Sequence, residues 1–313
     1  MASIVALHAS LTADLTGKSV IITGAANGIC LETALQYYAN GANIAIADLA
    51  SSQNSAEETI RRLDDPSRAL FVPVDITRRD DMGGLFAKTV ERFGRVDIVV
   101  ANAGIMESRR FFDFDVDEKG ELKDDGFGRV IDVNLKGTMN TLKHAVFRMK
   151  DNPPDQDGWR GSVVLVASTS GYFGGTEVIS YVSSKHGVIG LLRSSHGPAE
   201  SLGIRVNAVA PLTTPTFMTS GFSAAWEEEG LPTNTPAAVA AGILQMSLDT
   251  HMRGKCCLIV GGTYREIEGP LAKTSYSWTG EAIDDLFLKV GNFFRKLGGY
   301  PLPPRRYIGQ SGC

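Results

Sequence analysis

The sequence predicts an α/β fold, in which a doubly wound, seven-stranded parallel sheet is followed by a C-terminal helical extension. Three observations support this prediction. From Lys18 onward, short apolar runs rich in β-branched residues alternate with longer segments of helical period. The apolar runs are continuous, which is typical of parallel strands buried on both faces. The chain has 313 residues, 43% of them hydrophobic, which is enough to bury one large core.

Strands and helices are expected to follow one another in strict order. The expected strands cover residues 19–23, 43–48, 69–75, 96–104, 161–168, 204–211 and 255–262. The expected helices cover residues 28–40, 54–64, 78–93, 126–150, 180–202 and 236–250. Because parallel strands need right-handed helical crossovers, this order places helices on both faces of a single sheet. We therefore expect one domain over residues 1–262.

Three segments lie outside this alternation. Residues 151–160 are expected to form an exposed loop, and residues 212–235 a long irregular insert of the kind that covers an active site. The tail over 263–313 contains an amphipathic helix at 281–297. Its apolar positions are Ile283, Leu286, Phe287, Val290, Phe294 and Leu297. We expect this face to be buried on the body or on a neighbouring subunit, where it extends the core, helps to close the site or joins subunits.

Composition and charge exclude several classes of protein. The net charge of −4 and the absence of a Lys/Arg block predict binding neither to nucleic acid nor to an anionic membrane. The four cysteines show no metal-binding or disulfide spacing, so we expect no metal and a reducing, cytoplasmic compartment. No apolar run reaches membrane-spanning length, and no basic segment precedes the apolar N-terminal patch, so neither a membrane span nor a signal peptide is expected.

A glycine-rich turn follows the first strand and leads directly into a helix. It reads Thr23-Gly24-Ala25-Ala26-Asn27-Gly28-Ile29-Cys30. Glycines in such a turn let the backbone approach a pyrophosphate, whose charge is met by the first N–H groups and the dipole of the helix. The turn therefore predicts a Rossmann-type dinucleotide site that includes Gly24, Asn27, Gly28 and Ile29.

The cofactor preference is predicted from Asp48, which ends the second strand twenty residues after Gly28. A carboxylate at this place accepts hydrogen bonds from both ribose hydroxyls of an adenosine and repels a 2′-phosphate. The neighbouring positions, Asn27 and Leu49, supply no cation for such a phosphate. We therefore expect NAD rather than NADP. The alternative is that Asp48 only caps the following helix.

Tyr181 and Lys185 lie four residues apart and so share one face of the expected helix. A free tyrosine is a poor base at neutral pH, but a neighbouring ammonium lowers its pKa toward working pH. Ser168 precedes Tyr181 by thirteen residues, at the carboxyl end of the fifth strand. Because a doubly wound sheet binds ligands at that edge, we expect these three side chains to form a catalytic group.

Together these residues resemble the short-chain dehydrogenase/reductase family over roughly residues 16–262. The resemblance rests on TGAANGIC, Asp75 in VDIT, Asn102-Ala103-Gly104, Asn134 in VNLKG, Ser168 and YVSSK, in the order of the family. It implies an NAD(P)-binding catalytic domain over residues 1–262, a small-molecule substrate, and a homodimer or homotetramer.

The resemblance implies a role for each residue of these motifs. Ser168 would hydrogen-bond the substrate oxygen, Tyr181 would transfer the proton, and Lys185 would hold the nicotinamide ribose while lowering the tyrosine pKa. Asn134 would kink its helix and hold a water of the proton relay. Asp75 would contact the adenine amino group and Asn102 the adenosine. Further cofactor contacts are implied for Ile76, Ala103, Gly104, Pro211, Thr213 and Thr216.

Two positions depart from the family pattern. Cys30 stands where a third glycine permits close packing of helix and strand, and Leu212 replaces the glycine that follows Pro211. We expect these side chains to weaken or shift the cofactor locally. A thiol at a helix N-terminus has a lowered pKa, which leaves redox sensing by Cys30 as an alternative to simple packing. His186 is expected to be structural, because the Tyr/Lys pair already supplies a base.

The predicted function is NAD-dependent interconversion of a secondary alcohol and a ketone by hydride transfer. Six residues beside Ser168 are expected to line the substrate pocket: Tyr172, Phe173, Phe217, Met218, Phe222 and Trp226. They indicate a bulky lipophilic substrate such as a terpenoid, steroid or polyketide alcohol. Two alternatives remain open, namely a non-redox lyase, isomerase or cyclase on the same fold, and a cofactor-binding protein without turnover.

Overall fold

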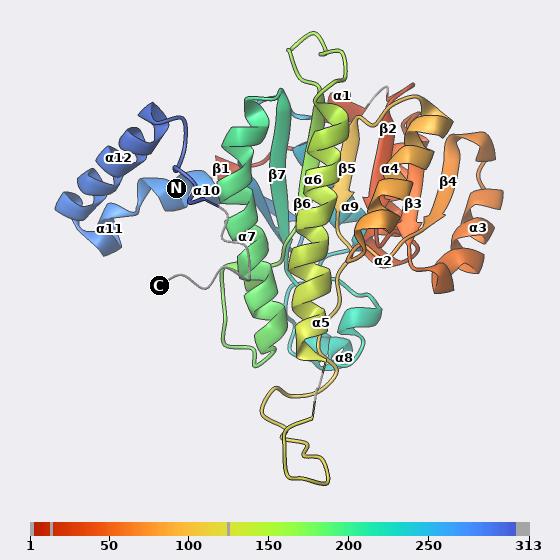
Figure 1. The fold of residues 1–313 in the computed structure, drawn as a ribbon. Coiled ribbons are helices and arrows are strands. Elements are labelled where there is room, and N and C mark those ends of the chain that lie inside the picture. Colours follow the sequence, from red (N-terminus) through yellow and green to blue (C-terminus); the bar gives the residue numbers. More distant parts are fainter. Residues whose placement is uncertain (1–2, 13–14, 124–125, 305–313) are drawn as a thin grey trace. The chain divides into compact units, whose positions relative to one another are not determined.

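The computed structural model describes residues 3–12, 15–123 and 126–304 of the chain. Residues up to Glu268 form one compact unit, in which helices cover both faces of a nine-stranded sheet (Figure 1). The strand order is β1-β9-β8-β7-β6-β5-β2-β3-β4. This arrangement confirms the predicted doubly wound α/β fold.

Seven neighbouring strands of this sheet run parallel, as predicted. They are β2 (Ser19–Thr23), β3 (Asn43–Asp48), β4 (Ala69–Pro73), β5 (Ile98–Ala101), β6 (Gly161–Val166), β7 (Ile204–Pro211) and β8 (Cys256–Val260). All five residues of β2 are buried, which explains why this strand shows no alternation. Val20 of β2 pairs with Ile44 on one side and Ile98 on the other, so the chain order reverses at β2 and β5. Ligands bind at such a switch point in doubly wound sheets.

Long helices pack on the two faces and create two apolar cores. One face is covered by α4 (Arg79–Phe93), α6 (Thr138–Met149) and α7 (Ile179–Glu200), and the other by α2 (Gly28–Ala39), α3 (Gln53–Arg61) and α9 (Pro236–Leu248) (Figure 1). Tyr37 of α2 and Phe86 of α4 are among the largest fully buried side chains. Burial of these side chains stabilises the packing of α2 and α4 on the sheet.

The predicted helix over residues 126–150 is divided into three parts. It consists of α5 (Phe127–Ile131), a π-helical turn η3 (Asp132–Gly137) and α6. The turn is closely packed, because a Cβ atom at Gly137 would collide with the side chain of Ile76. π-helical turns often occur at functional sites, and this one carries Asn134. The predicted kink at Asn134 therefore takes the form of a widened turn.

Several short elements were not predicted from the sequence. They are β1 (Ser3–Ile4), α1 (Ala9–Thr12), η1 (Ala50–Ser52), η2 (Pro66–Arg68), η4 (Thr169–Gly171), η5 (Phe217–Thr219), α8 (Ser223–Glu228) and β9 (Thr263–Glu266). β9 returns antiparallel to β8 after Gly261 and Gly262, both of which have positive φ. The sheet therefore continues past residue 262, and the insert over 212–235 is partly helical.

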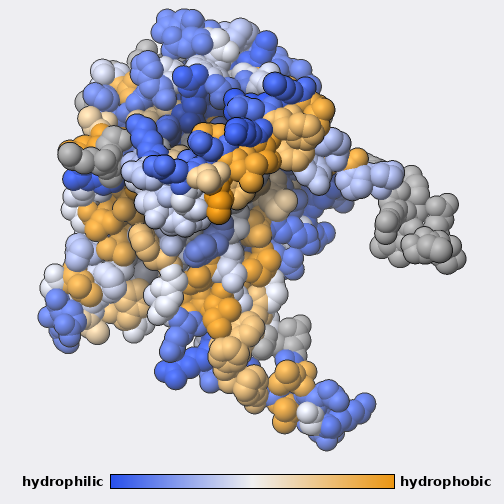
Figure 2. Space-filling model, turned by 90° about the vertical axis from the view of Figure 1, so that its left-hand side faces the viewer, coloured by the Kyte–Doolittle hydropathy of each residue, from blue (hydrophilic) through white to orange (hydrophobic). Residues whose placement is uncertain are grey.

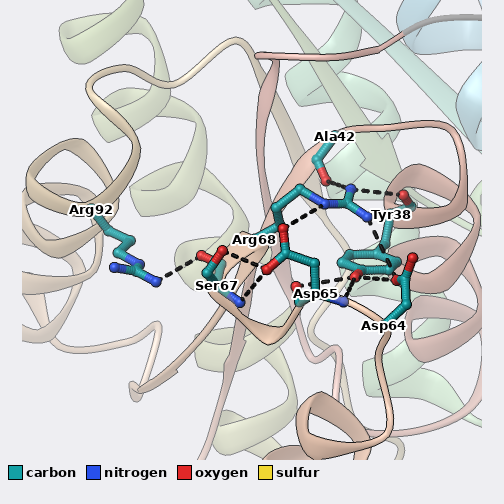
Figure 3. A network of polar contacts seen from close by, with 7 residues as sticks. All are labelled: Tyr38, Ala42, Asp64, Asp65, Ser67, Arg68 and Arg92. Atoms are coloured by element: carbon teal, nitrogen blue, oxygen red, sulfur yellow. Dashed lines mark hydrogen bonds and ion pairs between the residues drawn. The ribbon is translucent and has the colours of Figure 1, made fainter.

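A polar network holds the end of α2 against the turn that precedes β4 (Figure 3). The Arg68 guanidinium lies 3.8 Å from the centre of the Tyr38 ring and donates to the carbonyl oxygens of Tyr38 and Ala42. The Tyr38 hydroxyl donates to Asp64 and accepts from the Asp65 N–H. These contacts hold the edge strand β4 beside β3.

Residues from Gly269 onward form a second compact unit. Its helices are α11 (Tyr276–Thr279) and α12 (Glu281–Lys296), preceded by α10 (Glu268–Lys273). α12 confirms the helix expected at 281–297, with acidic residues in its first turn and basic ones in its last, which suits the helix dipole. Within the described part of the chain, no helix is both long enough and apolar enough to cross a membrane.

Candidate active site

A cavity of about 230 Å³ opens where the carboxyl ends of β2, β3 and β5 meet. Seven of the residues predicted to bind the cofactor line it: Gly24, Asp48, Asp75, Ile76, Asn102, Ala103 and Gly104. The cavity also includes Arg129 and Val133, which the sequence did not single out. Residues from five separate segments thus converge on one hollow, which is the form of a small-molecule or cofactor site.

The glycine turn has the backbone that its sequence predicts. Gly24 and Gly28 have φ values of 68° and 59°, which side chains rarely allow. A Cβ atom at Gly24 would lie 2.8 Å from Ala103 Cα, and one at Gly28 would lie 3.2 Å from Thr216 Cγ2. Because these two glycines have no side chain, the turn lies close to Ala103 and Thr216, which belong to two other predicted cofactor segments.

Thr23 joins the ends of β2 and β5, although it was not among the predicted site residues. Its hydroxyl oxygen accepts from the backbone N–H groups of Asn102 at 3.0 Å and Ala103 at 3.2 Å. The Asn102 side-chain amide donates in return to the Thr23 carbonyl at 3.3 Å. Thr23 could have been identified from the sequence, because it is the first residue of the glycine motif.

The Asp48 carboxylate is held by two segments at once. Its Oδ2 accepts from the Ala26 N–H in the glycine turn at 3.0 Å, while Oδ1 accepts from the Leu49 N–H at 2.7 Å and the Ser52 hydroxyl at 3.3 Å. An ionised carboxylate has about four acceptor sites, and three of them are used here, so about one is left for a further donor such as a ribose hydroxyl. If Asp48 only capped the following helix, the contacts of Oδ1 would be explained, but the hydrogen bond between Oδ2 and the glycine turn would not.

Asp75 has partners of its own in the wall of the cavity. Oδ1 accepts from the Thr77 N–H and hydroxyl, and Oδ2 lies 3.2 Å from the Arg129 guanidinium. Burial alone would raise the pKa of Asp75, but the contacts with Thr77 and Arg129 hold it below its usual value. The carboxylate is therefore charged and fixed at the wall of the cavity.

Cys30 is fully buried within α2 and packs in the core on that face of the sheet. Burial raises the pKa of its thiol well above the ordinary value, and the charge of Asp48 raises it further. Because a reactive cysteine needs an accessible thiolate, these surroundings disfavour the redox-sensing alternative. The side chain is accommodated as a small apolar core residue.

The three predicted catalytic side chains meet at the end of β6. Ser168 follows this strand, is buried, and forms a hydrogen bond with Tyr181 in the first turn of α7. The Lys185 ammonium lies 5.6 Å from the centre of the Tyr181 ring and donates to the Val166 carbonyl at 2.8 Å. A strand end and one helical turn thus place an alcohol, a phenol and an amine side by side.

Burial shifts the titration of both bases. It raises the pKa of the Tyr181 phenol, which the hydrogen bond with Ser168 lowers and the Glu107 carboxylate raises. The same effect lowers the pKa of Lys185 to about 8. Desolvation disfavours the charged form of each group, and perturbed values of this kind are typical of functional sites.

Asn134 joins the π-helical turn to the loop after β5 and to α7. Its side chain exchanges hydrogen bonds with the backbone of Ile105 and donates to the Ser184 hydroxyl at 3.0 Å. Gly104 lies close by, because a Cβ atom there would be 3.2 Å from Asn134 Oδ1. Ser184, which the sequence did not single out, links this amide to the helix that carries Tyr181.

The segment that begins at Pro211 continues the sheet without strain. The Leu212 N–H donates to the Ile259 carbonyl at 2.9 Å, and Leu212 has no positive φ. Asn234 braces the segment, because its side-chain amide donates to Leu212 and Ile259 and its N–H donates to Thr213. A leucine therefore replaces glycine here without disturbing the backbone.

The predicted substrate residues divide into two groups, and none of them lines the cavity at β2, β3 and β5. The Tyr172 hydroxyl donates to Glu268 at 2.6 Å, and its ring packs on the core. The other five lie in the segments that follow β6 and β7, and four are exposed: Phe173, Phe217, Met218 and Phe222. Phe222 and Trp226 have ring centres 6.0 Å apart. His186 is exposed and its Nδ1 contacts the Val182 carbonyl, which fits a structural role.

A second exposed apolar segment leaves the same edge of the sheet. The loop between β5 and α5 carries Phe112, Phe114 and Leu122, each more than 60% exposed. Figure 2 shows hydrophobic residues along this loop, which is the lowest projection of the molecule. Sequence reasoning missed it, because aromatic residues in a charged loop show no period.

Comparisons with known proteins agree with this geometry. The family described as short chain dehydrogenase matches residues 18–226. The short-chain dehydrogenase/reductase prx4 of Penicillium roqueforti is 33% identical over 294 residues, covering 88% of this chain and 84% of that protein. Human 3-hydroxyacyl-CoA dehydrogenase type-2 is 33% identical over 198 residues, covering 63% and 74%.

Solved structures give the same result. The crystal structure of 3-hydroxyacyl-CoA dehydrogenase type-2 from Mycobacterium avium has a TM-score of 0.67 at 29% identity, covering 79% of this chain and 96% of that one. A short-chain dehydrogenase/reductase from Mycobacterium marinum has a TM-score of 0.67 at 28% identity, covering 81% and 97%. The likeness therefore extends over nearly the whole length of both solved chains.

Proposed function

Because the chain belongs to the short-chain dehydrogenase/reductase family, we propose that it is an NAD-dependent enzyme that interconverts a secondary alcohol and a ketone. The observation that carries this proposal is the meeting of Ser168, Tyr181 and Lys185 at the end of β6. These groups can hold a substrate oxygen and move its proton. The cavity at the carboxyl ends of β2, β3 and β5 suits a dinucleotide.

The residues present fit NAD. Gly24 and Gly28 leave the space that a Cβ atom would fill, and Asp48 presents a fixed carboxylate in the cavity wall. We propose that the first N–H groups of α2 meet the pyrophosphate, that Asp48 holds the adenosine ribose, and that Asp75 and Asn102 lie at the adenosine. The negative charge of Asp48 favours NAD over NADP. When bound, NAD supplies the acceptor or donor of the hydride.

The residues of this chain supply the proton transfer. In alcohol oxidation the Tyr181 phenolate takes the hydroxyl proton, while Ser168 holds the same oxygen; in ketone reduction the phenol returns the proton. The Lys185 ammonium stabilises the phenolate, because an opposite charge favours the ionised form. Asn134 fixes the turn that packs against α7 and thereby the place of the tyrosine.

Replacement of Tyr181 tests this proposal. Tyr181→Phe should lower turnover by at least about 100-fold, because the proton donor and acceptor is lost. Binding of NAD, followed by calorimetry, should persist. Tyr276→Phe, at an exposed tyrosine of the C-terminal unit, is the matched control and should keep wild-type turnover. Undiminished turnover of Tyr181→Phe would disprove the catalytic assignment.

We also propose that the substrate is bulky and lipophilic. Phe217 is 96% exposed and lies in the same insert as the Phe222–Trp226 pair. Exposed apolar side chains of this kind mark binding surfaces. A panel of terpenoid, steroid and polyketide alcohols, a 3-hydroxyacyl-CoA suggested by the name of a relative, and small polar alcohols tests the proposal. Faster turnover of the small polar alcohols would refute it.

The non-redox and binding-only alternatives are separated by the absorbance of reduced nicotinamide during turnover. A redox enzyme changes this absorbance in step with product, and the alternatives do not. Cys30 and Leu212 were the residues that favoured both alternatives. Because the fold accommodates these two side chains, neither alternative is proposed.

We further propose a cytoplasmic location, since Cys30, Cys256 and Cys257 are buried free thiols suited to a reducing compartment. We also propose a homodimer or homotetramer, which the family resemblance implies. Light scattering measures the assembly.

A further inference from the structure

The loop after β5 places a carboxylate at the first turn of α7. Glu107 Oε1 accepts from the Ser180 N–H at 2.9 Å, and Oε2 accepts from the Tyr181 N–H at 3.1 Å. The first N–H groups of a helix have no partner within the helix and carry partial positive charge. The N-cap residue of α7, Val178, makes no side-chain hydrogen bond to them. Glu107 therefore caps the helix from a distant part of the chain.

Glu107 is itself held in place by the residues around it. Two positions earlier, Ile105 is bound on both its N–H and its carbonyl by Asn134. Glu107 is half-buried, so its charge is only partly screened by solvent. The loop that carries Glu107 is thus fixed at Ile105, close to the helix that Glu107 caps.

The charge of Glu107 acts on the phenol of Tyr181. Burial raises the pKa of this phenol, the hydrogen bond with Ser168 lowers it, and Glu107 raises it. Lys185, on the same helix, is the cation beside the ring. Other charged groups packed near α7 are paired elsewhere: Arg129 of α5 with Asp75, and Asp132 with Lys136 in the turn η3. Arg193 of α7 is likewise paired, with Glu268, whereas the charge of Glu107 acts on the Tyr181 phenol.

We propose that Glu107 is a positioning residue of this site, whose carboxylate fixes the first turn of α7 and whose negative charge opposes formation of the Tyr181 phenolate. This inference rests on the proposed function, in which Tyr181 moves the proton. A neutral phenol is the form that gives its proton to a ketone oxygen, so Glu107 favours the reductive role at neutral pH. The opposing ammonium of Lys185 favours the phenolate needed for oxidation.

The pH dependence of alcohol oxidation tests the proposal in the intact enzyme. Oxidation needs the phenolate, so kcat/KM rises with pH through the pKa of Tyr181. Glu107→Gln keeps an acceptor for the helix but removes the charge, and should move this rise to lower pH. Asp113→Asn, which removes an exposed charge from the same loop, should leave the profile in place.

A measurement without turnover separates this proposal from the proposed function. In protein made with isotope-labelled tyrosine, NMR follows the titration of Tyr181, which Tyr181→Phe identifies by the loss of its signal. Glu107→Gln should lower the midpoint of that titration as well. If the midpoint moves but no redox turnover exists, the proposed function fails and the action of Glu107 stands.

An unmoved midpoint together with an unmoved pH profile would overturn the proposal. Should Glu107→Gln fail to fold, Glu107→Asp and Glu107→Asn give the same comparison with a shorter side chain. The Tyr181 phenol should then titrate at a higher pH in the aspartate variant than in the asparagine variant. Equal midpoints for this pair would likewise overturn the proposal.

Discussion

Asn134 and Ile105 exchange two hydrogen bonds at the edge of the sheet where the site lies. The Ile105 N–H donates to Asn134 Oδ1 at 2.8 Å, and Asn134 Nδ2 donates to the Ile105 carbonyl at 2.8 Å. The same amide donates to Ser184 of α7. One buried side chain therefore joins the loop after β5, the π-helical turn and the helix that carries Tyr181 and Lys185.

Asn134→Ala should destabilise the protein and impair turnover together. The substitution removes both hydrogen bonds to the backbone of Ile105, and a typical hydrogen bond contributes about 0.5–1.5 kcal/mol to stability. We expect a lower melting temperature by calorimetry and a kcat/KM reduced by about 10-fold or more, because misplaced catalytic groups react slowly. An unchanged melting temperature would show that the two hydrogen bonds contribute nothing.

Asp48→Ser should weaken the preference for NAD. Loss of the carboxylate removes charge-assisted hydrogen bonds to the ribose and the repulsion of a 2′-phosphate, so KM for NAD should rise by about 10-fold or more. Adding Leu49→Arg supplies a cation and should lower KM for NADP. Steady-state kinetics with both cofactors measures the ratio. A ratio that stays at the wild-type value would contradict the assignment of Asp48.

Lys185→Met should abolish turnover but not stability. The pKa of Lys185 falls from 10.5 to about 8 on burial, so between these values the folded protein binds fewer protons than the unfolded chain. Its stability should therefore rise with pH across this window, and below about pH 8 the buried charge is a cost. The methionine variant should lack this rise and unfold at an equal or higher temperature at pH 7. Thermal unfolding across pH 7–10, compared with wild type, measures both effects.

Tyr172→Phe should act on stability rather than on substrate binding. The Tyr172 hydroxyl donates to Glu268, which Arg193 also binds at 2.8 and 3.0 Å. Because Arg193 continues to neutralise Glu268, we expect a loss of only about 1 kcal/mol and an unchanged KM. Phe217→Ala is the comparison, and should raise KM for a lipophilic alcohol. A large change of KM in Tyr172→Phe would place Tyr172 in the substrate pocket after all.

The parts of the fold that were predicted are those that depend on local sequence. The strands at 19–23, 43–48 and 204–211 are bounded as expected, because continuous apolar runs occur where both faces of a strand are buried. The helix at 126–150 was predicted without its π-helical turn, since apolar period alone does not reveal an extra residue in one turn. The edge strand β9 was missed because its sequence, TYRE, is not apolar.

The same division holds for the site. The meeting of Ser168, Tyr181 and Lys185 was predictable from the sequence, because their spacing along one helix and at the end of one strand already specifies which residues are neighbours. Three other contacts became visible only in the folded chain: Glu107 caps α7, Asn134 binds Ile105, and Tyr172 donates to Glu268. Each of these contacts joins residues from different segments of the fold. No local period or motif encodes which distant groups will lie within hydrogen-bond distance, because their positions depend on how the helices pack on both faces of the sheet.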